Sequence, residues 1–300
     1  MDRPIATGLP APRLPTRGQA FWTLMVILCA IGFGLVPVFA RGLTEAGMAA
    51  PAVAFYRYAL TALVTLPFLA LSPDKRGLTC IGMAAGFCMG IGWIAYVEAV
   101  KVAPVSTVGV VYMTYPLFTL IAAWALLKQR PQGRAMIAGL MILAGAGLAM
   151  SPQALGEAPV SALLLAFAAP LSFGIAITIL TGWLYRLTPL ERVATVPVGA
   201  SIGLLPLMIG EEAAHVLPQL GDWPLIAGLA VVTALLPMLL YVIAAPRIGA
   251  ARTAIAGSFE LPTMFALGWV AFGESVGPLQ FCAGALVVCA IFLVPRHEHD

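Results

Sequence analysis

The strongest constraint on this chain is a succession of ten apolar stretches, each about as long as a helix that crosses a lipid bilayer. A hydrocarbon core about 30 Å thick is crossed by about 20 helical residues. Hydrophobic residues make up 61% of the 300 residues and charged residues 10%, so little of the chain remains for a water-exposed domain. The sequence therefore predicts an all-α, multi-pass protein of the bacterial inner membrane, with ten transmembrane helices near residues 20–40, 50–71, 78–100, 105–127, 134–150, 160–184, 192–210, 223–244, 251–272 and 278–295.

The distribution of Lys and Arg orients these helices, because cytoplasmic loops are enriched in basic residues. With the amino terminus in the cytoplasm, only Arg41 and Lys101 lie in outer loops, and Arg57 lies within a helix. The other thirteen of the sixteen basic residues share the cytoplasmic side: Arg3, Arg13, Arg17, Lys75, Arg76, Lys128, Arg130, Arg134, Arg186, Arg192, Arg247, Arg252 and Arg296. The outer side collects Glu45, Glu98, Glu157, Glu211, Glu212, Asp222 and Glu274. This sorting predicts that both termini are cytoplasmic, and it explains the net charge of +3 without a nucleic-acid partner.

Five cysteines lie in or beside the apolar stretches and have no CxxC spacing: Cys29, Cys80, Cys88, Cys282 and Cys289. An odd number without that spacing predicts neither a disulfide framework nor a metal site. We interpret them as small packing residues and expect no metal and no cofactor.

The two halves of the sequence resemble each other at an offset of 145–146 residues. The segment that begins at Tyr96 (YVEAVKVAP) aligns with the one at Tyr241 (YVIAAPRIG), and Pro116 aligns with Pro262. We divide the chain into a cytoplasmic leader (1–19), a first five-helix repeat (20–150), a second five-helix repeat (151–295) and a cytoplasmic tail (296–300). Because five is odd, the second repeat must be inverted in the membrane. Inverted repeats place a transport pathway at their interface.

Several short motifs resemble one family of membrane proteins. They are Phe55-Tyr56-Arg57-Tyr58 on the second helix, the Ala-Pro-Val-Ser opening of the fourth, the prolines Pro116 and Pro262, and Gly273-Glu274 at the end of the ninth. In these features the chain is similar to the drug/metabolite transporter superfamily, in its EamA-type ten-helix branch. Its aromatic central helices also resemble the YddG-type aromatic amino acid exporters. The resemblance implies a carrier for a small solute, with substrates across the superfamily that range from amino acids to drugs and nucleotide sugars.

Two charged residues lie at membrane depth, where an ionised side chain costs at least about 2.5–3.5 kcal/mol. Glu260 lies about 13 Å into the ninth predicted helix at 1.5 Å per residue. It faces either the pathway, as a proton-titrating group or a partner for a substrate ammonium, or a buried structural partner. We interpret Arg57 as a residue that holds the second helix against the bundle or reaches towards the membrane surface.

Aromatic residues away from the membrane surfaces are candidates for substrate contact. A cavity for an amphipathic solute needs rings that stack on its apolar part and hydroxyl groups that form hydrogen bonds. Plain packing is the alternative for each of the six candidates, which are Trp93, Tyr96, Tyr112, Tyr115, Phe173 and Tyr241.

Prolines and glycines mark where helices bend or approach closely. A proline within a membrane helix frees a backbone carbonyl and bends the axis, which predicts hinges or tolerated kinks at Pro37, Pro116, Pro170, Pro237 and Pro262. GxxxG ridges at Gly82, Gly86 and Gly90 and at Gly199 and Gly203 favour close helix packing within the chain over a dimer interface.

These features predict a transporter that exports small metabolites, above all aromatic or bulky apolar amino acids, by alternating access through a central cavity. Helices 1, 3, 4, 6, 8 and 9 are expected to wall the cavity, with helices 5 and 10 peripheral. Export of another metabolite or drug is the alternative. A membrane-embedded enzyme is less favoured, because His215, His297 and His299 lie in a loop or the tail and no HExxH or GxSxG motif occurs. We expect a small-molecule substrate, a lipid environment and a monomer, with a homodimer as the alternative.

Overall fold

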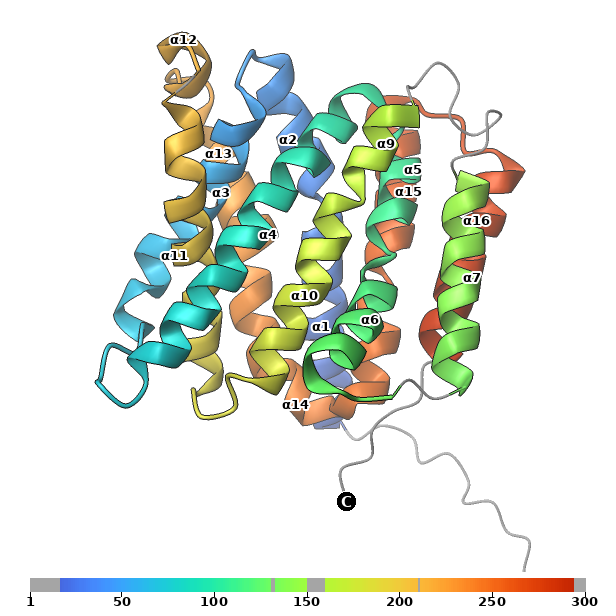
Figure 1. The fold of residues 1–300 in the computed structure, drawn as a ribbon. Coiled ribbons are helices and arrows are strands. Elements are labelled where there is room, and N and C mark those ends of the chain that lie inside the picture. Colours follow the sequence, from blue (N-terminus) through green and yellow to red (C-terminus); the bar gives the residue numbers. More distant parts are fainter. Residues whose placement is uncertain (1–16, 131–132, 150–159, 210, 294–300) are drawn as a thin grey trace, which may run out of the picture.

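The computed structural model describes residues 17–130, 133–149, 160–209 and 211–293, and all regular structure in these residues is helical. The helices stand side by side in a bundle (Figure 1). Six segments are long and apolar enough to cross a membrane: Gly18–Glu45, Arg76–Val102, Val105–Leu127, Val160–Gly182, Pro189–Met208 and Trp223–Ala245. Shorter apolar helices lie at Gly133–Ala149, Glu260–Phe272 and Pro278–Ala290. Most of the predicted leader and all of the predicted tail lie outside the described residues.

Several predicted spans are divided into two consecutive helices. These are α1 (Arg17–Gly34) with α2 (Val36–Glu45), α5 (Val105–Tyr112) with α6 (Tyr115–Leu127), and α9 (Val160–Ala166) with α10 (Ala168–Gly182). The undivided helices are α4 (Arg76–Val102), α7 (Gly133–Ala149), α11 (Pro189–Met208) and α16 (Pro278–Leu293). The second predicted span is α3 (Ala50–Thr65), which ends in a 3-10 turn at Leu66–Phe68, and the short α12 (Ala213–Val216) lies in the loop after α11.

The boundary predicted between spans 223–244 and 251–272 falls where the chain reverses direction, because one candidate span ends at Ala245, but no gap between helices marks it. The chain forms α13 (Trp223–Ala227), a π-helix (η2, Gly228–Leu235), α14 (Leu236–Gly257) and α15 (Glu260–Phe272). The Thr253 hydroxyl nevertheless donates to the Ala245 carbonyl at 3.3 Å, although eight residues of a straight α-helix rise about 12 Å. The chain therefore bends back within α14, and the break in regular structure lies at residues 258–259.

Each of the five predicted hinge prolines lies in the first turn of a helix that follows a break or the π-helix. Pro37, Pro116 and Pro237 are the second residues of α2, α6 and α14, and Pro170 and Pro262 are the third residues of α10 and α15. Proline fits the first turn because the N–H that it lacks would have no partner there. Within a continuous helix each proline would lack the N–H for the bond to the preceding turn and its ring would crowd that turn, which explains why the breaks come just before it.

The breaks in the two halves correspond closely. Helices α6 and α15 both have 13 residues and begin 145 positions apart, at Tyr115 and Glu260. Both end in a residue with left-handed backbone geometry, Lys128 (φ 58°) and Gly273 (φ 64°). The two segments run in opposite directions, since α5 begins where α15 ends (Figure 1).

The two glycine ridges pack against each other. A Cβ atom at Gly86 would collide with the carbonyl oxygen of Val196, and one at Gly199 would collide with that of Met83. Helices α4 and α11 therefore approach to backbone contact, and any side chain larger than hydrogen at these two positions would push them apart. The ridges serve packing within the chain, as the sequence predicts.

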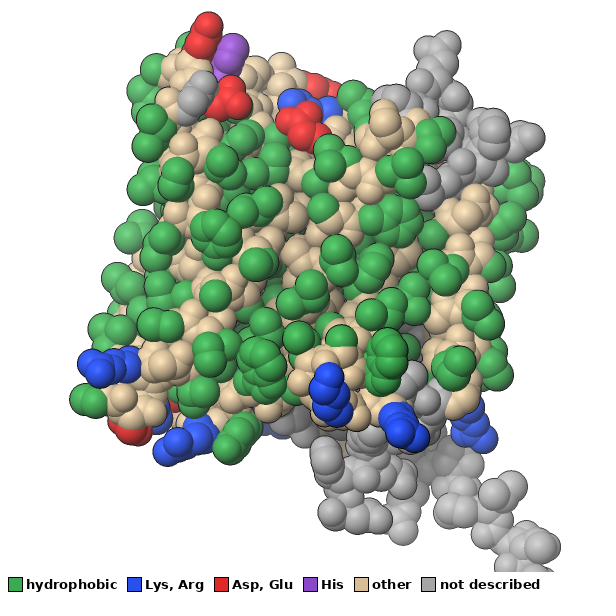
Figure 2. Space-filling model, in the orientation of Figure 1, with side chains coloured by type: hydrophobic (Ala, Val, Ile, Leu, Met, Phe, Trp, Pro, Cys, Tyr) green, Lys and Arg blue, Asp and Glu red, His purple; other side chains and the backbone are tan. Residues whose placement is uncertain are grey.

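Apolar side chains cover the sides of the bundle, whereas charged residues gather at its two ends (Figure 2). We call the lower end in Figures 1 and 2 the basic end. The loops and helix ends found there in Figure 1 contain Lys75, Arg76, Lys128, Arg130, Arg134, Arg186 and Arg247. The loops and helix ends at the opposite, acidic end contain Glu98, Glu211, Glu212, Asp222 and Glu274, together with Arg41 and Lys101. This arrangement gives the molecule an apolar belt between two polar ends, as a multi-pass membrane protein requires.

Candidate functional site

A cavity of about 520 Å³ lies inside the bundle. Its deep wall includes Arg57, Trp93 and Glu260, and it extends to Thr181 and Pro189 at the basic end of α10 and α11. Residues of α1, α3, α4, α5, α6, α10, α11, η2, α14 and α15 line it, and none of the described lining residues comes from α7 or α16. The predicted walls are therefore confirmed in position, but α3 and α11 contribute as well. Their contribution was not expected, because the prediction relied on prolines and aromatic residues. Tyr58 is the one aromatic residue among the described lining residues of α3 and α11.

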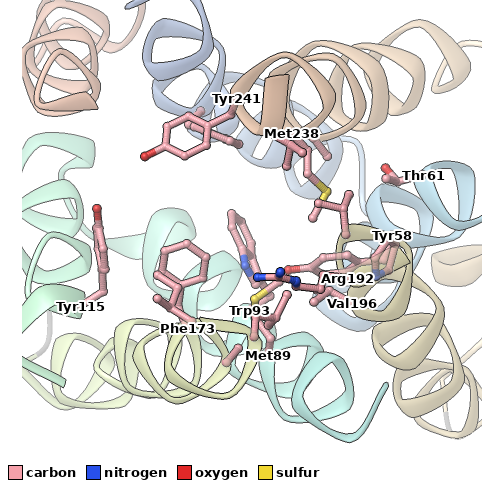
Figure 3. Close-up of a pocket in the computed structure, with 18 of the residues that line it drawn as sticks. Tyr58, Thr61, Met89, Trp93, Tyr115, Phe173, Arg192, Val196, Met238 and Tyr241 are labelled. Carbon is pink, nitrogen blue, oxygen red and sulfur yellow. The ribbon is translucent and has the colours of Figure 1, made fainter. Parts of the chain in front are cut away.

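Aromatic rings form a continuous cluster on one side of the cavity. The ring centroids of Tyr112 and Phe173 lie 5.8 Å apart, those of Tyr115 and Phe173 lie 5.0 Å apart, and those of Trp93 and Tyr112 lie 6.2 Å apart. These distances are typical of favourable aromatic pairs. Tyr241 lies across the opening from this cluster, as Figure 3 shows.

Tyr96 does not line the main cavity. It lies behind Trp93, with the two ring centroids 4.8 Å apart, and only 1% of its surface is exposed. Its hydroxyl group is buried and has no hydrogen-bond partner among the described residues, and it lies beside a small hollow of about 10 Å³ that Arg57 and Glu260 also line. That volume is about the size of one water molecule.

Arg57 is held in the cavity wall by several contacts at once. Its guanidinium carbon lies 3.8 Å from the centre of the Trp93 ring, in a cation–π contact. One terminal nitrogen donates to the Thr233 carbonyl at 3.0 Å and the other to the Tyr58 hydroxyl at 3.5 Å. These bonds join α3 to η2, and they agree with a role for Arg57 in holding the second predicted helix against the bundle.

Glu260 is the first residue of α15, and it lines both the cavity and the small hollow. The amino-terminal end of a helix carries partial positive charge, which favours a carboxylate there. Within the described residues the Glu260 side chain makes no hydrogen bond or ion pair of its own, so its carboxylate is available to a solute. Its counterpart in the first half is Tyr115, which also lines the cavity.

The predicted hinge prolines are not among the described lining residues; Pro189 and Pro197 of α11 are. Pro237 and Pro262 are each within two residues of a lining residue, Met238 and Glu260 respectively. These two prolines therefore lie close to the cavity without lining it.

Arg192 is a lining residue that the sequence assigned only to the orientation of the helices. It lies in the first turn of α11, near the basic end of the cavity. Its Nε donates to the Leu187 carbonyl at 2.9 Å. Hydropathy gives the depth of such a residue but not the direction in which its side chain points, so no sequence signal separated it from the other basic residues.

At the acidic end of the bundle, the side chain of Glu274 joins two helices. The Glu274 carboxylate accepts hydrogen bonds from the backbone N–H groups of Val105 (2.6 Å) and Ser106 (3.2 Å) and from the Ser106 hydroxyl (3.1 Å), and it lies 3.8 Å from Arg41. We call this group the Glu274 clamp. It ties the end of α15 to the beginning of α5. None of these four residues is among the described lining residues of the cavity, which reaches the basic end.

Comparisons with known proteins agree with these features. The EamA-like transporter family matches residues 20–151 and again residues 160–295. An uncharacterized transporter from Archaeoglobus fulgidus is 24% identical over 286 residues, which is 90% of this chain and 95% of that protein. A solved crystal structure is similar with a TM-score of 0.64 and 17% sequence identity, and the match covers 91% of this chain and 96% of the other. The crystal structure supports the fold alone. The described residues hold no group of three or more His, Cys, Asp or Glu side chains that could bind a metal ion.

Proposed function

Because the chain belongs to the EamA-like transporter family, it is a multi-pass membrane transporter for small molecules and not an enzyme, and we propose that it exports amino acids with aromatic or bulky apolar side chains. The observation that carries this proposal is the combination, in one cavity, of an aromatic cluster and the available carboxylate of Glu260. The aromatic cluster suits an apolar side chain, and Glu260 suits an ammonium group. The volume of about 520 Å³ lies within the range of small-molecule sites, roughly 300–1,000 Å³.

The mechanism that we propose is alternating access between two inverted five-helix repeats, 20–150 and 151–295. Ten spans result if the broken helices are joined and α3, α7, the second half of α14 with α15, and α16 each cross once. The matched breaks before Tyr115 and Glu260, on segments that run in opposite directions, support this inverted relation. Broken helices near the middle of a membrane are a recurrent feature of substrate sites in such carriers. The breaks followed by Pro37, Pro116, Pro170, Pro237 and Pro262 would be the hinges.

We place the protein in the bacterial inner membrane with both termini and the basic end in the cytoplasm, following the distribution of basic residues. The cavity then reaches the cytoplasmic side, where an exporter loads its substrate. A monomer is sufficient for this mechanism, because the cavity lies within a single chain.

The test is substrate flux in proteoliposomes that contain the purified full-length chain. Trp93→Ala and Tyr241→Ala are expected to reduce the flux of phenylalanine more than that of alanine, because each removes a ring from the cavity. Trp269→Ala is the matched control, since Trp269 is 69% exposed on the outside of the bundle. Normal phenylalanine flux in both cavity variants, or a wild-type protein that moves no amino acid, would contradict the substrate while leaving the membership of the transporter family intact.

A further inference from the structure

Arg192 differs from the other basic residues near the basic end, because it lines the cavity (Figure 3). The helix that carries it begins with a capping box. The Thr188 side chain accepts from the Glu191 N–H, and the Glu191 side chain accepts from the Thr188 N–H. This local structure, together with the bond from Arg192 Nε to the Leu187 carbonyl, fixes the base of the guanidinium. Its two terminal nitrogens have no hydrogen-bond partner among the described residues.

The nearest carboxylate in the sequence does not neutralise Arg192. Glu191 accepts two hydrogen bonds from the Lys75 ammonium, at 2.8 and 3.2 Å, and one from the Thr188 N–H at 2.7 Å. No described Asp or Glu lies within ion-pair distance of the Arg192 guanidinium. Arg192 is therefore a half-buried cation in the cavity wall with two free donor groups.

Among the described lining residues of the cavity three carry a charge, and they differ in what they can offer a solute. Arg57 already donates from both terminal nitrogens and lies against the Trp93 ring. Glu260 offers a carboxylate, which suits a cationic group. Arg192 alone combines positive charge with free donors, and the parallel N–H groups of a guanidinium match the two oxygens of a carboxylate.

We propose that Arg192 binds the carboxylate of the substrate at the basic-end mouth of the cavity and restricts transport to solutes that carry one. This inference rests on the proposed function and adds to it the residue that recognises the acidic half of the substrate.

The test compares three ligands with the same phenyl group and different charges: L-phenylalanine, 3-phenylpropionate with only the carboxylate, and phenethylamine with only the ammonium. Binding to the purified full-length protein is measured for the wild type, Arg192→Gln, Arg192→Lys and Arg186→Gln. Arg186 is the matched control, because it is an exposed arginine at the same end and outside the described cavity lining.

Arg192→Gln is expected to weaken binding of 3-phenylpropionate and phenylalanine by about tenfold to a hundredfold, the range of a hydrogen-bonded charge pair. Phenethylamine affinity should stay within about twofold by the same reasoning, since that ligand has no group for Arg192 to bind. Arg192→Lys should restore part of the loss, and Arg186→Gln should change none of the three affinities.

Equal losses for all three ligands would show a structural role and overturn the inference, as would unchanged binding of 3-phenylpropionate. So would a wild-type protein that does not bind 3-phenylpropionate at all. The proposed function is judged separately by phenylalanine flux. Arg192-dependent binding of 3-phenylpropionate without phenylalanine flux would support carboxylate recognition and reject amino acids as the transported substrate. Melting temperatures of the four proteins identify a variant that has lost its fold.

Discussion

Replacement of Glu274 by Gln is expected to open the acidic end of the transporter. The substitution keeps the size of the side chain but removes its charge and one of its two acceptor oxygens. In the structure those oxygens receive three hydrogen bonds from Val105 and Ser106, and two of these come from N–H groups at the start of α5 that have no partner within the helix. The clamp should therefore weaken in the state that is closed at this end, while the state that is open there loses nothing.

The expected magnitude follows from the individual contacts. A hydrogen bond to a charged group contributes about 1.5–3 kcal/mol and one between neutral groups about 0.5–1.5 kcal/mol. The Arg41 pair at 3.8 Å, with both side chains partly exposed, adds about 0–1 kcal/mol. The variant loses the charge on the acceptor, one acceptor oxygen and the pair with Arg41. Together these losses should destabilise the clamp by about 2–3 kcal/mol, since neighbouring contacts are not fully additive. The ratio of open to closed molecules at the acidic end should then rise about 30-fold to 150-fold.

Thiol labelling measures this change directly. Val105→Cys, in a background without the five native cysteines, places a reporter at a fully buried position beside the clamp. Labelling by a membrane-impermeant maleimide from the acidic-end side should accelerate in the Glu274→Gln protein by the factor above. Glu98→Gln is the control, since Glu98 pairs at the same end with Lys101 but is exposed. Equal labelling rates in the Glu274 variant and its parent would refute the reasoning.

Three further predictions follow from the same structure. Glu260→Gln should abolish substrate accumulation driven by a pH gradient and preserve counterflow in proteoliposomes, because Glu260 is the one carboxylate among the described lining residues. A wild-type substrate flux that does not respond to the pH gradient would argue against coupling to protons. Gly86→Leu should lower the melting temperature by several degrees, because the new side chain clashes with α11 at a cost of about 1–3 kcal/mol or more. Gly147→Leu should leave the melting temperature unchanged, because a Cβ atom there meets no described atom within 4 Å. Impermeant labels should reach the loop at residues 211–222 from the side of the membrane opposite to both termini, and labelling of all three from one side would contradict the proposed topology.

Much of the architecture could be predicted because hydropathy and charge vary along the axis of each helix and so indicate where it enters and leaves the membrane. The apolar stretches gave the helices, and the basic residues gave the two ends that Figure 2 shows. Prolines gave the breaks, because Pro116 and Pro262 each lack a backbone N–H and crowd the preceding turn, and both effects are local. Arg247 and the glycine after it indicated a boundary near residue 250, and the chain bends back there, although helical structure continues through the bend to Gly257.

The rotation of each helix about its axis could not be predicted as well. Glu260 and Tyr241 were placed in the pathway by their type and depth, and the structure has both in the cavity wall. Tyr96 has the same type and depth, but the rotation of α4 places it behind Trp93. Arg192 was missed for the same reason, since depth alone does not distinguish an arginine that faces the cavity from one that faces lipid headgroups.

The π-helix at Gly228–Leu235 determines which face the following helix presents to the cavity. A wider turn takes up one more residue than an α-helical turn, and each residue turns an α-helix by about 100°. The angular position of Met238 and Tyr241 therefore depends on the number of residues between Trp223 and Leu236 as much as on their identity. A shortened relative that lost one residue in η2 would keep its hydropathy profile and its predicted span, yet it would turn the Tyr241 ring about a quarter of the way around the helix, away from the cavity.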